Sequence, residues 1–105
     1  MSSAADKLLE PAKGAFSAPF AGVLRVECTD DGSSLWIDGR GEAIDVSEKA
    51  PPELEGRFCL WRSDRSTLSL ILSGQRHLET AYTSGRIKIS GDMAVMARLE
   101  LKGAE

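Results

Sequence analysis

The sequence predicts an α+β fold: a five-stranded, mainly antiparallel sheet with helices on one face. Three observations predict it. Apolar and polar residues alternate with a period of two up to about residue 62, glycine- and aspartate-rich turns separate these segments, and helical spacing follows. Strands first and helices later are typical of an α+β architecture. A chain of 105 residues has room for one core, so residues 1–105 are expected to form a single domain.

The N-terminal segment 3–16 is rich in Ala, Leu, Lys and Glu, which favours a short helix. Proline lacks an N–H group and its ring clashes with the preceding turn of a helix. We therefore expect a break at Pro11, with one helical turn over residues 6–10 and another over 12–16. Pro19 should end the helical segment and begin extended chain.

Five segments are expected to be strands: 23–28, 34–38, 42–46, 57–62 and 86–90. Turn residues join the first three into an antiparallel meander, because glycine tolerates a positive φ and aspartate bonds to nearby backbone. The residues expected to face the core are Leu24, Val26, Leu35, Ile37, Ile44, Val46, Phe58, Leu60, Ile87 and Ile89. Trp36 and Trp61 have the opposite parity. We expect both on the outer face, covering the sheet or contacting a second subunit.

Three helical segments surround the last strand. The first carries Leu68, Ile71 and Leu72 at i, i+3, i+4 spacing, with Ser63 or Asp64 as its N-cap and an end at Gly74. Leu78, Ala81 and Tyr82 repeat this spacing before Gly85. Gly91-Asp92 begins a last helix that carries Met93, Val95, Met96 and Leu99.

Composition argues against several classes of function. The net charge of −3 disfavours polyanions, so nucleic acid is not an expected partner. Apolar runs such as Leu70-Ile71-Leu72 are far too short to span a bilayer. The first residues lack the basic-then-apolar pattern of an export signal, which favours a cytoplasmic location. Cys28 and Cys59 lack the spacing of a metal site, so we expect free thiols.

No catalytic constellation stands out in the sequence. His77 is the single histidine, and no HxxxH, HExxH or GxSxG motif is present. Gly39-Arg40-Gly41 joins two strands, and no helix follows that could receive a phosphate. We therefore expect no enzyme, no metal and no cofactor.

A local pattern occupies the C-terminal part: Leu72-Ser73-Gly74, Ala81-Tyr82, Ser84-Gly85-Arg86-Ile87-Lys88-Ile89, Gly91-Asp92-Met93 and Leu99. This pattern, strongest over residues 64–99, resembles the sterol carrier protein type 2 family. Before residue 64 the likeness rests on strand order and turn positions. The resemblance implies an apolar tunnel between sheet and helices that holds fatty acyl chains, acyl-CoA or sterols. Segments 65–73 and 75–83 match the family's two short helices, and 92–101 matches the closing helix that walls the tunnel.

Two features depart from the family pattern. The family's long N-terminal helix is reduced here to about ten residues that contain Pro11, so we expect the tunnel's cover to be thinner or missing. The chain ends in Lys102-Gly103-Ala104-Glu105, without the peroxisomal address that some members carry. No peroxisomal location is therefore inferred.

The residues expected to bind the ligand lie on these helices and the last strand: Leu68, Ile71, Leu72, Leu78, Tyr82, Ile87, Ile89, Met93, Met96 and Leu99. Thioethers suit such a pocket because they reshape around varied ligands, yet the same spacing also fits plain core packing. Each buried methylene of a ligand gains about 0.8 kcal/mol, so apolar walls suffice without a charged anchor. Arg86 and Lys88 either contact anionic head groups transiently or form an ordinary solvated strand face.

Two functions follow from these features. The first is a non-catalytic carrier domain that holds a fatty acyl, acyl-CoA or sterol-like ligand, with at most transient membrane contact. The second is an interaction module of the same fold with a collapsed pocket, either a homodimer or an accessory domain of an enzyme that metabolises lipids or alkyl sulfates. The short N-terminal helix and the two tryptophans motivate the second.

Overall fold

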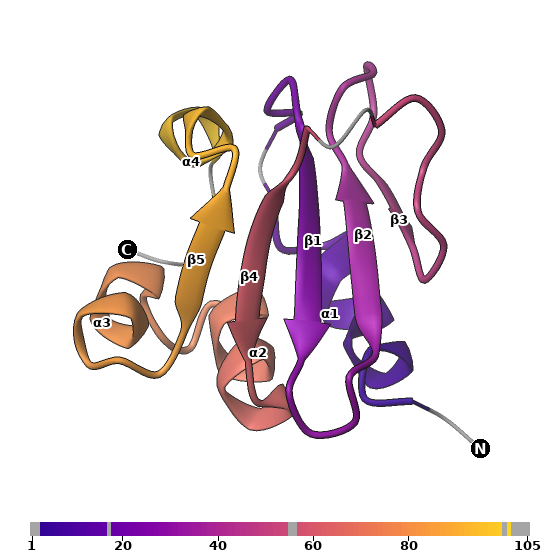
Figure 1. The fold of residues 1–105 in the computed structure, drawn as a ribbon. Coiled ribbons are helices and arrows are strands. Elements are labelled where there is room, and N and C mark those ends of the chain that lie inside the picture. The colour runs from indigo at the N-terminus through magenta and orange to yellow at the C-terminus, as the bar shows by residue number, and fades with distance from the viewer. Residues whose placement is uncertain (1–2, 17, 55–56, 100, 102–105) are drawn as a thin grey trace.

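The computed structural model shows the predicted α+β fold, a five-stranded sheet with helices (Figure 1). It describes residues 3–16, 18–54, 57–99 and 101. The strand order is β3-β2-β1-β4-β5. The strands are β1 Val23–Cys28, β2 Ser34–Asp38, β3 Asp45–Ser47, β4 Cys59–Ser63 and β5 Lys88–Gly91. Neighbours pair antiparallel, except that β1 and β4 run parallel. The sheet is therefore mainly antiparallel, as predicted.

Helical elements precede, interrupt and follow the strands. They are the 3₁₀ helix η1 Asp6–Leu8, α1 Leu9–Lys13, α2 Arg65–Leu72, α3 Leu78–Thr83 and α4 Ala94–Arg98. In Figure 1, α1 and α2 lie behind the sheet, and α3 and α4 flank the edge strand β5. Every helical element and the strands β1, β2 and β4 contribute buried residues to one core cluster. This cluster lies on the helix-covered face of the sheet. This arrangement leaves the β5 edge bordered by two short helices.

A row of apolar residues crosses the inner face of the sheet from strand to strand. Val26 pairs with Leu35 on one side and with Trp61 on the other, and Trp61 pairs with Ile89 on β5. Leu35, Val26 and Trp61 are fully buried, whereas Ile89 is half-buried at the edge. The hydrophobic face of the sheet thus ends at Ile89, where the sheet meets α3 and α4.

The predicted parity of β4 is wrong. Trp61 and Cys59 are fully buried on the inner face, and the alternate residues Phe58 and Leu60 are only half-buried. Every position from 58 to 61 is apolar, so alternation alone could not decide which set faces inward. Parallel pairing with β1 decides it, because Cys59 and Trp61 stand beside the buried residues of that strand. For Trp36 the prediction is confirmed: its ring lies on the outer face against Phe58, with ring centroids 5.0 Å apart.

The predicted helix break at Pro11 is also wrong. η1 and α1 follow one another without interruption, and Pro11 is the third residue of α1. The first N–H groups of a helix have no intrahelical acceptor, so a proline in the first turn removes no hydrogen bond. The helix ends at Lys13, short of the predicted turn at 12–16, and Phe16 instead bridges to Leu101.

The closing helix is shorter than the predicted segment 92–101. Leu99 has extended backbone, with φ −81° and ψ 131°, and Leu101 forms an isolated bridge to Phe16. Residue 100 lies outside the described residues. Pairing with the N-terminal segment thus replaces the last predicted turn.

The N-cap of α2 carries a testable pH dependence. The Asp64 carboxylate accepts hydrogen bonds from the Thr67 backbone N–H at 3.0 Å and the Thr67 hydroxyl at 2.7 Å. The hydrogen bond from the Thr67 hydroxyl is the main reason that the pKa of Asp64 is lowered. A lowered pKa means that Asp64 stabilises the fold above the pKa of the unfolded chain, near 3.9, and that this contribution disappears as the pH falls.

We expect Asp64→Ala to lower the free energy of unfolding by about 1 kcal/mol at pH 7. Asp64→Asn retains a capping oxygen, so it should be less destabilising but should flatten the acid limb of stability against pH. Urea titrations between pH 2 and pH 7 measure both effects. An acid limb that is unchanged in Asp64→Asn would contradict this assignment.

Candidate functional site

An apolar groove of about 300 Å³ lies where α3, β5 and α4 meet. Its lining residues are Leu78, Glu79, Tyr82, Ile89, Met93 and Met96. Tyr82 is 52% exposed and Met93 48% exposed, and they are the large hydrophobic residues that the described surface leaves most open. The groove is therefore an open, largely hydrocarbon-lined depression rather than part of the packed core.

Helical spacing places the walls of the groove. Leu78 and Tyr82 are four residues apart on α3 and so share one face of the helix. Their neighbour Ala81 is fully buried and anchors α3 to the core. Met93 and Met96 lie one helical turn apart at α4, where Val95 is the buried anchor. Each short helix thus buries a small residue and leaves its larger apolar side chains along the groove.

Trp61 connects the groove to the core. Its indole Nε1–H donates a hydrogen bond to the Met96 sulfur at 3.2 Å, and the indole ring is fully buried. A buried indole N–H needs an acceptor, and the thioether is a weak but adequate one. This contact fixes Met96 at the inner wall, while Ile89, the cross-strand partner of Trp61, forms the floor.

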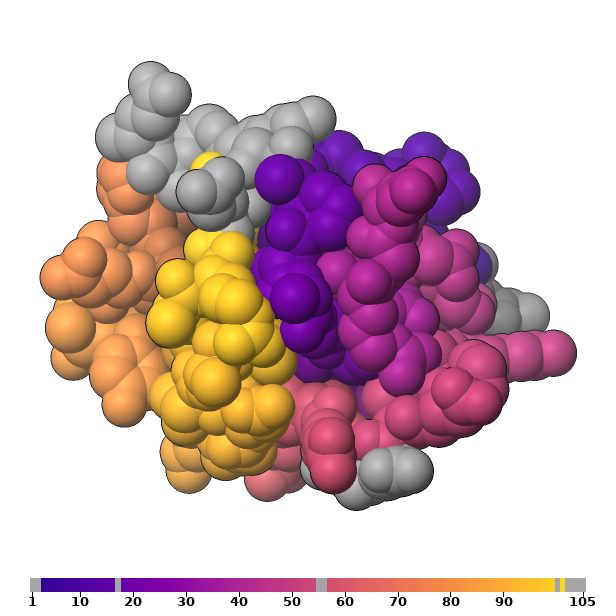
Figure 2. All heavy atoms as spheres, turned by 90° about the horizontal axis from the view of Figure 1, so that it is seen from above, coloured from indigo at the N-terminus to yellow at the C-terminus, as the bar shows by residue number. Residues whose placement is uncertain are grey.

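The helix α4 is held against the segment that leads into β1, and Figure 2 shows the two side by side. The Arg98 guanidinium donates to the carbonyl oxygens of Phe20 and Ala21, at 2.9 and 3.2 Å. A Cβ on Gly22 would come within 2.7 Å of a Val95 methyl carbon, so only glycine permits this approach without a shift. These contacts hold α4, which forms one wall of the groove, against residues 20–22 in the N-terminal part of the chain.

The structure brings together five of the predicted binding residues, Leu78, Tyr82, Ile89, Met93 and Met96, at one groove. Four others are buried in the core: Leu68, Ile71 and Leu72 on α2, and Ile87 before β5. Leu99 is half-buried just after α4. The binding role of all ten residues stays a prediction. Glu79 also lines the groove and was missed, because a charged residue on a short helix reads as solvent-facing.

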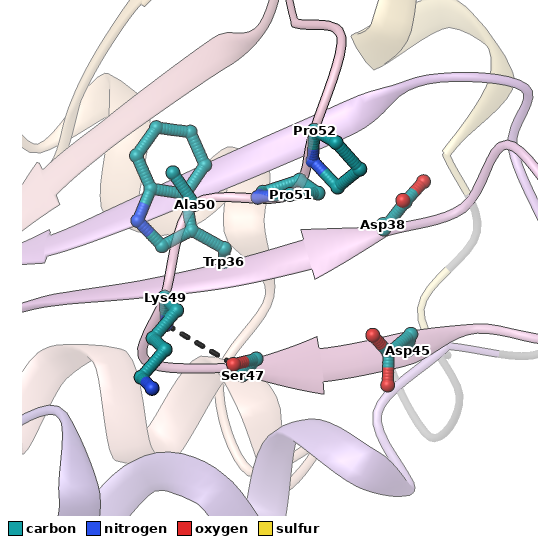
Figure 3. Close-up of a pocket in the computed structure, with 8 residues that line it drawn as sticks. All are labelled: Trp36, Asp38, Asp45, Ser47, Lys49, Ala50, Pro51 and Pro52. Carbon is teal, nitrogen blue, oxygen red and sulfur yellow. Dashed lines mark hydrogen bonds between the residues drawn. The ribbon is translucent and has the colours of Figure 1, made fainter.

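A second hollow, of about 190 Å³, lies on the outer face of the sheet (Figure 3). Trp36 and Ala50 stand at one end and Asp38 and Asp45 at the other, with two prolines between them. The Arg40 guanidinium binds Asp38 through two hydrogen bonds of 2.9 Å and lowers the pKa of that carboxyl group. Carboxylates interrupt the lining, so this hollow lacks the continuous apolar wall that a lipid chain requires.

The tryptophans do not provide the exposed aromatic surface expected for an interaction module. Trp61 is fully buried, and Trp36 is 9% exposed. Trp36 is covered by Phe58 and by the Arg25 guanidinium, which lies 5.2 Å from the centroid of its ring. Dimer formation stays a prediction, but these two side chains no longer motivate it.

The remaining reactive groups are accounted for by burial. Cys28 and Cys59 are free and buried, and burial is the main reason that each thiol pKa rises to about 11. Both are therefore protonated near neutral pH and weak nucleophiles. The described residues contain no group of three or more His, Cys, Asp or Glu side chains that could hold a metal ion. Among the same residues, no helix is long and apolar enough to cross a membrane.

Comparison with protein families gives one match over nearly the whole chain. The family model described as the SCP-2 sterol transfer family matches residues 3–101. This range includes the groove, the whole sheet and the N-terminal helical segment. No curated protein sequence matches the chain.

Solved structures share the fold at low sequence identity. Sterol carrier protein 2 from Yarrowia lipolytica, in its apo form, has a TM-score of 0.55 at 12% identity, over 88% of this chain and 73% of that one. The ubiquinone synthesis protein UbiJ-SCP2 has a TM-score of 0.54 at 21% identity, over 92% and 75%. Sterol carrier protein 2 like 2 from Aedes aegypti has a TM-score of 0.51 at 18% identity, over 75% and 70%. At these identities the likeness shows a shared fold.

Proposed function

Since the chain belongs to the SCP-2 sterol transfer family, we propose that it is a non-catalytic lipid-binding domain whose ligand lies in the groove between α3, β5 and α4. The ligand is an aliphatic chain or a sterol-like molecule. The observation that carries this proposal is the groove itself: apolar side chains from two helices and the sheet edge converge there, and half of the Tyr82 and Met93 surface is open.

The size of the groove sets the expected affinity. A space of about 300 Å³ is at the lower end of ligand pockets. If it buried about ten methylenes, the gross gain would be about 8 kcal/mol, which corresponds to a Kd of about 1 μM. Ordering the ligand and the exposed side chains lowers this gain. We therefore expect micromolar or weaker binding unless the groove widens.

Two methionines allow the groove to widen at a small cost in free energy. An unbranched thioether has three rotatable bonds, so it adapts to ligands of different width. Met93 is exposed at the surface, whereas the Met96 sulfur accepts a hydrogen bond from the Trp61 indole. A lipid that displaced Met96 would remove the acceptor of a fully buried N–H, so the ligand is expected to lie against Met96 without displacing it.

Filling the groove from within tests this proposal. We expect Met93→Trp to weaken binding of a neutral fluorescent alkyl probe at least tenfold, because the larger ring occupies the space of the ligand and leaves the Trp61–Met96 hydrogen bond intact. Ala94→Trp is the matched control: it adds the same ring to an exposed position of α4 outside the groove. Fluorescence titration of the folded variants, checked by circular dichroism, measures both. Equal affinities for Met93→Trp and wild type would refute the assignment of the groove.

A further inference from the structure

Charged side chains are distributed unequally between two hollows that border β5: Glu79 lines the apolar groove, whereas three cations and the Asp64 carboxylate line the other. Glu79 is the one charged residue among the described residues that line the groove. A separate hollow of about 240 Å³, beside the β4–β5 pair, gathers the cations Arg62, Arg86 and Lys88. Lys88 and Ile89 are consecutive on β5, so their side chains point to opposite faces of the sheet. The groove therefore has an acidic border, although basic residues are close by in sequence.

Glu79 supplies a charged group at the border of the groove. It is exposed in the first turn of α3, three residues before Tyr82, so its carboxylate and the Tyr82 phenol share one side of the helix. The nearest cation on α4, Arg98, is occupied by the carbonyl oxygens of Phe20 and Ala21. A carboxylate or phosphate head group at this border would meet a like charge and no lining cation among the residues that the structure describes.

We infer that Glu79 selects the head group of the ligand, favouring aliphatic molecules that end in a hydrogen-bond donor, such as a hydroxyl or ammonium group, over those that end in a carboxylate or phosphate. This inference rests on the proposed function of the groove. Two unit charges about 4 Å apart in water change an affinity about fivefold. The change is favourable for an ammonium group and unfavourable for a carboxylate. Salt screens it, because both partners are exposed.

Three ligands with one alkyl chain test the inference: dodecylammonium, dodecanol and dodecanoate. Their Kd values are measured at low ionic strength by displacement of a neutral fluorescent probe from wild type, Glu79→Gln and Glu10→Gln. Glu10 is the control because it is an exposed carboxylate on α1, which contacts β3 at the opposite edge of the sheet.

We expect Glu79→Gln to lower the ratio of the dodecanoate Kd to the dodecylammonium Kd about tenfold or more, with the dodecanol Kd unchanged. Glu10→Gln should leave the ratio as in wild type, and 0.5 M salt should shrink the effect of Glu79→Gln. A ratio that Glu79→Gln does not change overturns the role of Glu79 while the groove remains a lipid site. Failure of all three ligands to bind overturns the proposed function as well.

Discussion

Gly91→Ala is expected to destabilise the fold by about 3 kcal/mol or more. Gly91 has φ +85°, and a Cβ there would overlap the Phe58 carbonyl oxygen, a backbone atom that cannot turn aside. The substitution adds left-handed strain to this overlap, at the point where β5 pairs with Cys59 and the chain turns into α4. Since a domain of this size has about 5–15 kcal/mol of stability, the loss would be a large share of it.

Gly85→Ala separates the two causes. Gly85 has a similar φ of +77°, but no atom lies within 4 Å of the position of its Cβ. Gly85→Ala should therefore lower the free energy of unfolding by about 1–2 kcal/mol, which is the cost of the left-handed backbone alone. Urea denaturation of the two variants beside wild type gives both values. Equal losses at the two sites would show that the contact with Phe58 does not restrict position 91.

Trp61→Ala is expected to cost about 3–5 kcal/mol, the range for large aromatic residues removed from a core. The indole is fully buried, and its N–H holds the Met96 sulfur. The substitution should also weaken ligand binding in any protein that remains folded, because Met96 loses the contact that positions it at the groove.

Leu60→Ala is the matched comparison because Leu60 is the next residue of β4 and lies half-buried on the outer face. We expect a loss of about 1 kcal/mol, since only part of the side chain leaves contact with the protein. The parity read from the sequence predicts the opposite order, with Leu60 in the core and Trp61 outside. Chemical denaturation of the two variants thus decides between the two orientations of β4.

Local patterns predicted most of the fold. Strands Val23–Cys28 and Ser34–Asp38 were predicted at their observed bounds. Residue alternation marks the first strand, and the Asp31-Gly32 turn separates it from the second. The helix that carries Leu68, Ile71 and Leu72 forms as predicted, and the structure places these three residues in the core. The predictions were wrong where a segment distant in the sequence determines the local structure. Parallel pairing with β1 orients Trp61, and the bridge between Phe16 and Leu101 shortens the closing helix.

The groove could be predicted only in part. Leu78, Tyr82 and Met96 line it, whereas Leu68 is buried in the core, although all four residues have the same helical apolar spacing. Periodicity tells which side of a helix is apolar, but what that side meets depends on tertiary packing. Glu79 was missed for the same reason, because its place in the lining of the groove depends on the tertiary packing of the side chains around it.

The most direct test of the lipid-binding groove is a methyl NMR titration of the protein, labelled at methionine and isoleucine methyl groups, with dodecanol. If the groove binds the alkyl chain, the methyl signals of Met93, Met96 and Ile89 shift in a saturable manner. Ile37, fully buried on β2 and away from the groove, is the internal reference and should not move. Saturable shifts confined to other methyl groups, or no shifts up to the solubility limit of dodecanol, would contradict the account.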